Sequence, residues 1–271
     1  MTAIEEFFRQ RYGREALYLP SARLGLYLAF REWLSPGDRL LMSPLTDDVV
    51  FFTVLAAGLR PVIGPVDPRT GNLDPAAIGD ATWSSLSAVL TTNLYGIPDR
   101  MDLIEERCRR HGLVLLGDAA HGFDSQFGGR KIGTFGTASV FSLGKHLEIP
   151  GGILSFRDSG RREHLARRAN EELRKPRSLS VVAYRWITFL KAFTGRRRAP
   201  RWVARVWNAT VLHPGRGHAH RMPYEEEAVR AAQDAGGGLD PFDDWVGMDH
   251  PAYRALPFPR VLQASLERLE T

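Results

Sequence analysis

The sequence predicts a three-layer α/β/α sandwich around a mostly parallel sheet, and three observations support this fold class. Short apolar segments alternate with helical patterns through residues 1–156. These segments are rich in Val, Ile and Leu without polar alternation, which is typical of strands buried on both faces. Turn sequences with Pro, Gly and Asp separate them. Because strands and helices alternate, helices are expected to cover both faces of a parallel sheet.

Six apolar segments are the expected strands: 39–43, 60–66, 86–92, 113–118, 138–143 and 152–156. The turn sequences SPGD (35–38), DPRTG (67–71) and FGG (127–129) fall between them. Helices are expected at 24–34, 48–57, 101–111 and 160–173. A further short helix opens the chain, where Thr2 and Glu5 have the spacing of a capping box.

The second half of the chain has a less regular pattern. Residues 179–194 are apolar and aromatic, and residues 195–207 are rich in Arg and Trp. A basic stretch with tryptophans can lie on a membrane surface, but packing on the same or a partner subunit is more common and is preferred here. Three glycines at 236–238 predict a loop, and residues 257–270 have helical periodicity.

Composition is that of a globular protein with one large core: 271 residues, 44% hydrophobic and 25% charged. No apolar run reaches 18 residues and the N-terminus lacks signal-peptide features, so a cytoplasmic protein without membrane contact is expected. The single cysteine, Cys108, excludes an internal disulfide and a cysteine-based zinc site. The net charge of +5 comes from local basic runs without a recognition module, so no nucleic-acid partner is expected.

A carboxylate is expected at the end of the strand at 113–118. The segment LVLLGDAAH places Asp118 at the carboxyl end of an apolar strand, before small residues. In open α/β sheets, ligands bind at this edge. The segment by itself fits a ligand-binding carboxylate, a helix cap and a metal ligand equally well.

A lysine follows the next expected strand, in the segment ASVFSLGK. Apolar surroundings would lower the pKa of Lys145 and make it a better nucleophile. The hydroxyl of Ser142 can bind a phosphate, and Gly151 and Gly152 let the backbone pass close to a ligand. Near the N-terminus, LPSARLGL opens a helix that Ser21 can cap, and free N–H groups there suit a phosphate. Taken singly, such a lysine or helix start usually binds no ligand.

Other constellations are weaker. No carboxylate or cysteine completes a metal site with the histidines His213, His218 and His220. A serine hydrolase built on Asp118, His121 and Ser142 would lack its G-x-S-x-G turn, and no G-x-G-x-x-G turn indicates a dinucleotide site.

In this order, the elements resemble the DegT/StrS-type sugar aminotransferase family across about the first 155 residues. The resemblance is carried by SARLGLYLAF, by SPGDRLLMSPLTDDVVFFTVLAAGLRPVIGPVDPRTGNLDP, by NLYGIPDRMDLIEERCRRHGLVLLGDAAHGF and by GGRKIGTFGTASVFSLGK. It implies the aspartate aminotransferase fold of pyridoxal 5′-phosphate (PLP) enzymes, that is, PLP-dependent transferase fold type I. It also implies a homodimer, and transfer of an amino group from an amino donor to a keto sugar nucleotide in amino-sugar biosynthesis.

The resemblance also assigns roles in the site. Lys145 is implied to form the Schiff base with PLP and to move the proton, and Asp118 to pair with the pyridine nitrogen. His121 takes the position next to the 3-hydroxyl group, while Ala22, Arg23 and Ser142 surround the phosphate. The cofactor-binding residues are therefore expected to be Ala22, Arg23, Asp118, His121, Ser142 and Lys145, with no metal.

The sequence departs from the family pattern at several points. His121 stands where the family usually has Gln, and Asp47 where many members have an aromatic or small residue. Ala252 replaces an asparagine before Tyr253, in a segment that in the family reaches the PLP phosphate of the other subunit. Residues 1–245 are expected to form the PLP-binding large domain, with an irregular basic insert at about 176–240, and residues 246–271 a remnant of the C-terminal segment. The family's small C-terminal domain is expected to be largely missing.

Two other functions stay open at this point. One is a truncated, non-catalytic paralogue that acts as a partner subunit, which Asp47, Ala252 and the short C-terminus favour. The other is a PLP enzyme with different chemistry, such as sugar dehydration, for which some family members use histidine in place of the lysine. His146 lies next to Lys145, so a misalignment by one residue would favour that alternative.

Overall fold

The computed structural model describes residues 2–147, 149–175, 225–248, 250 and 252–257. Its centre is a seven-stranded sheet in the order β1-β9-β8-β5-β4-β2-β3. The strands are β1 Glu15–Leu19, β2 Arg39–Met42, β3 Arg60–Ile63, β4 Ala88–Thr91, β5 Val114–Asp118, β8 Ala138–Ser142 and β9 Gly152–Phe156. Strands β3, β2, β4, β5 and β8 are parallel, and β9 runs antiparallel between β8 and β1. The sheet is therefore mostly parallel, as the sequence predicts.

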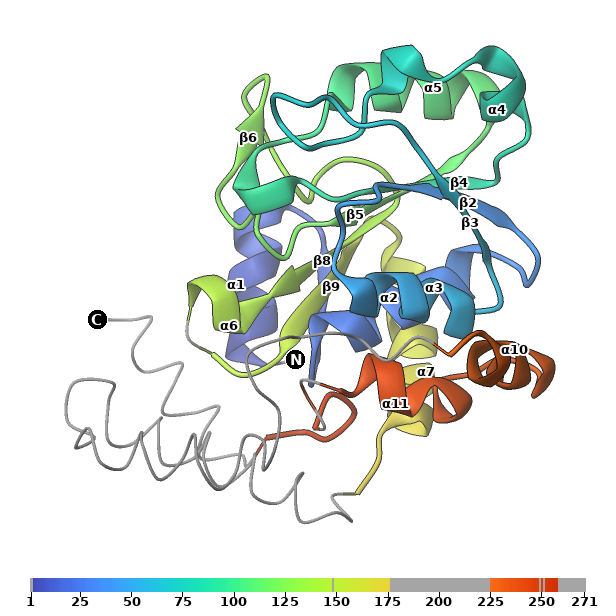
Figure 1. Cartoon of the computed structure of the whole chain (residues 1–271). Coiled ribbons are helices and arrows are strands. Elements are labelled where there is room, and N and C mark those ends of the chain that lie inside the picture. Colours follow the sequence, from blue (N-terminus) through green and yellow to red (C-terminus); the bar gives the residue numbers. More distant parts are fainter. Residues whose placement is uncertain (1, 148, 176–224, 249, 251, 258–271) are drawn as a thin grey trace, which may run out of the picture.

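Helices cover both faces of this sheet (Figure 1). On one face lie α1 Ala3–Tyr12, α4 Asp80–Ser84 and α5 Met101–His111. On the other face lie α2 Ala22–Trp33, α3 Asp48–Ala56 and α7 Arg162–Glu172, and against these pack α10 Glu226–Asp234 and α11 Asp243–Val246. The short helix α6 Leu143–His146 follows β8 directly, and β6 Gln126–Phe127 pairs with β7 Arg130–Lys131 in a small hairpin.

Side chains of the central strands supply two hydrophobic cores, one on each face. In β8, Val140 belongs to the core under α2 and Phe141 to the core under α1. Successive residues of a strand point to opposite faces, so a strand that is buried on both faces must be apolar throughout. This explains why the strands show no polar alternation in the sequence.

Local signals in the sequence fix several helix ends. Thr2 and Glu5 form the predicted capping box at the start of α1. Gly13 and Gly112 end α1 and α5 in the left-handed conformation, with φ of 64° and 66°, which glycine adopts without steric cost. The Ser21 side chain accepts a hydrogen bond from the backbone N–H of Leu24 and so caps α2.

All six predicted strands are present, with ends within a few residues of the expected bounds. Strands β1, β6 and β7 and helices α4, α6, α10 and α11 were not predicted. Strand β1 is short and contains Glu15 and Tyr18, and it gains its stability from pairing with β9, a partner distant in sequence. The predicted features at 179–194, 195–207 and 258–270, and the three histidines, lie outside the described residues.

The described residues between 240 and 257, here called the C-terminal segment, pack in the same core as the sheet. Phe242, Trp245, Val246 and Tyr253 are buried in the core under α2 and α3. The ring of Trp245 stacks on that of Phe52 in α3, with 5.3 Å between centroids. Within the described ranges, no helix is long and apolar enough to cross a membrane.

Candidate active site

A cavity of about 240 Å³ lies at the edge of the sheet where β5 and β8 end. The start of α2, the start of α3, the turn before β9 and one residue from the C-terminal segment complete its walls. Its polar and charged lining residues are Ser21, Arg23, Asp47, Asp118, Ser142, Lys145 and His250. Ala22 also lines it, so five of the six predicted cofactor-binding residues meet at one cavity; the sixth, His121, contacts it through Lys145.

Asp118 is the last residue of β5, and its carboxylate lies at the cavity wall. Its Oδ1 accepts a hydrogen bond from the backbone N–H of Ala120 at 2.9 Å. Burial raises the pKa of Asp118 to about 6, and the nearby Asp47 acts in the same direction, whereas the Ala120 N–H and Lys145 oppose it. A cationic ligand placed against this carboxyl group would stabilise its charged form.

Lys145 lies in α6, where its Nζ is 2.6 Å from Nε2 of His121. Burial lowers the pKa of His121, and the positive charges of Lys145 and His146 lower it further. His121 is therefore neutral near pH 7, and its Nε2 can accept a hydrogen bond from the lysine. The ring of Tyr95 meets His121 edge-on, with 5.9 Å between centroids.

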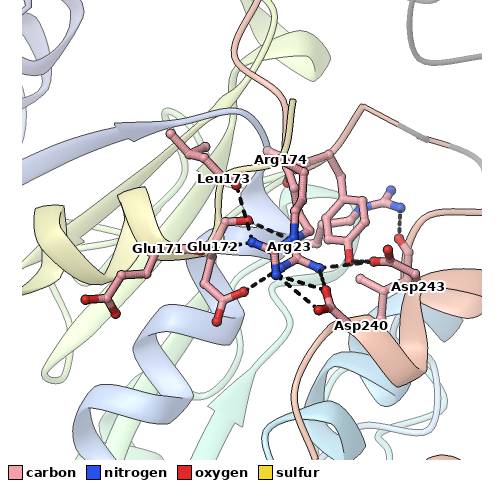
Figure 2. A network of polar contacts seen from close by, with 11 residues as sticks. Arg23, Glu171, Glu172, Leu173, Arg174, Asp240 and Asp243 are labelled. Atoms are coloured by element: carbon pink, nitrogen blue, oxygen red, sulfur yellow. Dashed lines mark hydrogen bonds and ion pairs between the residues drawn. The ribbon is translucent and has the colours of Figure 1, made fainter. Parts of the chain in front are cut away.

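The start of α2 and the start of β9 approach each other closely beside Ser142. A Cβ atom on Gly152 would lie 2.5 Å from the backbone nitrogen of Ala22, so this position requires glycine. The Ser21 hydroxyl donates to the backbone oxygen of Tyr253 at 2.9 Å. One guanidinium nitrogen of Arg23 donates to the backbone oxygen of Val246 (Figure 2), so this side chain lines the cavity while it also holds the C-terminal segment.

Some residues of the site were missed by the sequence analysis. His250 lines the cavity just before Ala252 and Tyr253, in a segment whose resemblance to the family is weak, and the sequence did not single it out as a site residue. Behind Asp118, the amide of Asn93 donates to the Asp118 backbone oxygen at 3.2 Å, and Asp99 accepts from the backbone N–H groups of Thr92 and Asn93. Asn93 has a positive φ of 47°, which is uncommon for a residue other than glycine and marks a constrained loop. This loop lies in the family segment NLYGIPD, the one signal that could have indicated it.

Asp47 adds a second carboxylate to the cavity wall. Asp47 lines the cavity and caps α3, where its Oδ1 accepts from the backbone N–H of Val49 at 3.0 Å. Among the residues that the structure describes, no three His, Cys, Asp or Glu side chains lie together as a metal site would need.

The model of the DegT/DnrJ/EryC1/StrS aminotransferase family matches residues 2–171. The spore coat polysaccharide biosynthesis protein SpsC of Bacillus subtilis is 33% identical over 131 residues, which are 48% of this chain and 34% of that protein. The L-glutamine:2-deoxy-scyllo-inosose aminotransferase of Streptomyces paromomycinus is 34% identical over 139 residues, 49% of this chain and 32% of that enzyme. The matched part thus spans about a third of the length of these curated relatives.

Solved structures show the same architecture. DesI in the presence of its TDP-sugar product has a TM-score of 0.52 at 30% identity, over 61% of this chain and 43% of DesI. PseC of Helicobacter pylori, an aminotransferase involved in the biosynthesis of pseudaminic acid, has a TM-score of 0.54 at 23% identity, over 65% of this chain and 49% of PseC. The likeness to PseC shows the fold and confirms the predicted fold class. From the family match and this shared fold, the chain belongs to the DegT/DnrJ/EryC1/StrS aminotransferase family.

Proposed function

We propose that this chain is a PLP-dependent aminotransferase that moves an amino group from an amino donor to a keto sugar nucleotide. The observation that carries the proposal is that Asp118 and Lys145 line one cavity at the carboxyl edge of the sheet. Relatives named as sugar aminotransferases, such as the dTDP-3-amino-3,4,6-trideoxy-alpha-D-glucose transaminase of Streptomyces venezuelae, support the substrate class.

The residues of the cavity fit PLP at both ends. Asp118 accepts a hydrogen bond from the Ala120 N–H and has a pKa of about 6, so a cationic ring nitrogen would stabilise its charged form. The hydroxyl of Ser142 and the first N–H groups of α2 suit a phosphate. Gly152 allows the start of β9 to pass close to Ala22, and this keeps Ser142 and the first N–H groups of α2 at the same cavity.

When bound, PLP supplies an electron-withdrawing ring that stabilises negative charge beside the transferred nitrogen. Asp118 would hold the proton on the ring nitrogen, and Ser142 would bind the phosphate. The Nζ of Lys145 would hold the cofactor and then move a proton, while His121 accepts a hydrogen bond from that amine and orients it. The chain would thus supply positioning and proton transfer.

Lys145 is favoured over its neighbour His146 as the reacting residue. Lys145 lines the cavity, whereas the ring of His146 stacks on Phe123, with 6.1 Å between centroids. Dehydratases also occur among the similar structures, one of which is described as GDP-4-keto-6-deoxy-D-mannose-3-dehydratase with bound hydrated PLP. The position of Lys145 supports amino transfer over dehydration.

Replacement of the lysine tests the proposal. Lys145→Ala should abolish amino transfer from glutamate or glutamine to keto sugar nucleotides, measured as loss of the donor by chromatography. Lys131→Ala is the matched control, because its Nζ donates to the Arg11 backbone oxygen at 3.1 Å and it does not line the cavity. Full activity in Lys145→Ala would contradict the assignment.

A partner-subunit function is the second candidate, because Asp47 places a second carboxylate in the cavity. If the pure chain binds PLP but transfers no amino group until a complete aminotransferase subunit is added, this second function is correct. We also propose that the chain forms a homodimer, which sedimentation equilibrium of the purified protein would test.

A further inference from the structure

Asp47 places a carboxylate at the start of α3, where this helix borders the cavity. Its Oδ1 accepts a hydrogen bond from the backbone N–H of Val49 at 3.0 Å, so one oxygen caps the helix. The side chain is exposed, and its other oxygen accepts no hydrogen bond from the residues that the structure describes. One carboxylate oxygen is therefore open to a ligand.

The cap of α3 does not require a charge at this position. Asn and Ser cap helices about as well as Asp does, because each offers a side-chain oxygen to the first N–H groups. Asp48, the next residue, already supplies an acidic side chain in the first turn, where it interacts favourably with the helix dipole. The stability of α3 therefore does not explain why residue 47 carries a negative charge.

The charge of Asp47 acts inside the cavity. Asp47 lines the same cavity as Asp118 and Lys145. Burial is the largest cause of the raised pKa of Asp118 and of the lowered pKa of His121, and the charge of Asp47 acts to raise both pKa values. Because Coulomb interactions weaken with distance, a ligand bound beside Asp118 also lies within the field of Asp47.

No cation of the described chain neutralises this carboxylate. Among the described residues, no Lys, Arg or His forms an ion pair with Asp47, and the Nζ of Lys145 lies beside His121. Val49 and Val50 give the same part of the cavity an apolar surface. A carboxylate next to an apolar wall suits an aliphatic group that carries an ammonium, since the carbon atoms contact the wall and the N–H groups donate to the carboxylate.

We propose that Asp47 is a specificity-determining residue that binds a second ammonium group of the substrate, one that is not transferred. The substrate is then a diamine, which is either an amino donor with two amino groups or a sugar that already carries one. Both present the same alkylammonium group to the open oxygen of Asp47. The inference rests on the proposed function, because it takes the transferred nitrogen to lie at PLP.

Stable conjugates of the cofactor with amines test this recognition without turnover. Phosphopyridoxyl-ornithine is compared with phosphopyridoxyl-norvaline, which lacks the second amine. For a ring substrate, the phosphopyridoxyl conjugate of diaminocyclohexane is compared with that of cyclohexylamine. Dissociation constants are measured at pH 7 by quenching of tryptophan fluorescence in the full chain. In at least one pair, the diamine conjugate should bind about fivefold more tightly than its analogue, the order of one partly exposed ion pair.

The pair that shows this preference identifies the source of the ammonium group. A preference for the ornithine conjugate indicates a diamino acid as the donor. A preference for the diaminocyclohexane conjugate indicates a sugar that carries an amino group. Any effect on the shared phosphopyridoxyl part cancels in the ratio within a pair.

Matched variants separate the charge from the helix cap. Asp47→Asn removes the charge and keeps a capping oxygen, so the preference should disappear while the helix is retained. Asp47→Ser, which also caps without charge, should give the same result. Asp48→Asn is the control, because it removes a carboxylate one residue away that does not line the cavity, and it should keep the full preference.

Failure of this inference and failure of the proposed function give different results. The inference alone is wrong if borohydride attaches PLP to Lys145, but the wild type shows no preference in either pair or the preference persists in Asp47→Asn. Asp47 would then act only as the cap of α3. If borohydride attaches no PLP to Lys145 in the wild type, the proposed function itself is wrong.

Discussion

The pKa of the Asp118 carboxyl group gives a prediction that can be measured directly. Burial raises its pKa to about 6, and Asp47 contributes to the rise. We predict that, without cofactor, ¹³C NMR of labelled aspartates shows one carboxyl that titrates near pH 6. Asp47→Asn removes a neighbouring negative charge and should lower that pKa. A titration at the ordinary value near 3.8 would contradict this description of the cavity.

The same shift makes stability depend on pH. The pKa of Asp118 is raised on folding, so its contribution is fully present below its unfolded value of about 4. This contribution is lost as pH rises through about 6. We predict that Asp118→Asn, which cannot ionise, reduces the fall in the urea midpoint between pH 4 and pH 7. An equal fall in wild type and variant would mean that other groups cause it.

At the residue scale, the sequence indicated those groups whose place follows from a strand end. Asp118, Ser142 and Lys145 come at or just after strands, and parallel strands end at one edge, so their meeting in a cavity was predictable. His250 was not, because its place at the cavity depends on the packing of the C-terminal residues on α3 and on Ser21, which are far away in sequence. The roles of Ala22, Arg23, Asp118, His121, Ser142 and Lys145 toward PLP remain predictions from the family resemblance.

At the scale of elements, the close approach of β9 to α2 gives a sharp prediction. A Cβ on Gly152 would meet backbone atoms of Ala22 and Phe141 at 2.5–2.8 Å, and backbone cannot move cheaply. Gly152→Ala should therefore lower the free energy of unfolding by about 1–3 kcal/mol in urea titrations. Gly144→Ala is the control, because its Cβ would have only one contact, at 3.8 Å, within a helix. Equal stability of both variants would show that the backbones of β9 and α2 lie further apart than this structure places them.

The cap of α2 gives a second prediction at this scale. Ser21 both caps the helix and donates to Tyr253, whereas Thr2 caps α1 from an exposed position. Thr2→Ala should cost about 1 kcal/mol, and Ser21→Ala about 2 kcal/mol because it also loses the bond to the C-terminal segment. Equal losses, by urea denaturation, would mean that the Ser21–Tyr253 bond adds nothing.

Periodicity identified most elements, and its failures have a common cause. Helices α2, α3 and α5 have long patterns and clear ends, and they form close to the expected bounds. The missed elements are short or far from the motif-bearing region, and long-range packing stabilises them more than local sequence does. Strand β1, for example, depends on its register with β9, where Leu17 pairs with Leu154.

At the scale of the whole molecule, the described C-terminal segment contributes to folding. Trp245 is 7% exposed and packs on Phe52 in the core. Trp245→Ala should lower the free energy of unfolding by about 3–5 kcal/mol. Leu256→Ala, at a side chain that is 45% exposed, should change it by less than about 0.5 kcal/mol. A Trp245→Ala variant as stable as wild type would show that this segment packs only loosely.

Fold class and family were predictable because they depend on local patterns in the first half of the chain. The sequence did not show that Val246 and Tyr253, beyond the expected boundary at 245, share one core with α2 and α3, since that depends on contacts between residues distant in sequence.

The measurement that tests the central claim most directly is reduction of the PLP-treated protein with borohydride, followed by peptide mapping. Our account predicts an absorbance band of a PLP–lysine adduct before reduction and a single modified peptide that carries PLP on Lys145. Lys131, which lies in the β6–β7 hairpin, should stay unmodified. Absence of the band, or modification spread over surface lysines without Lys145, would contradict the proposed cofactor site.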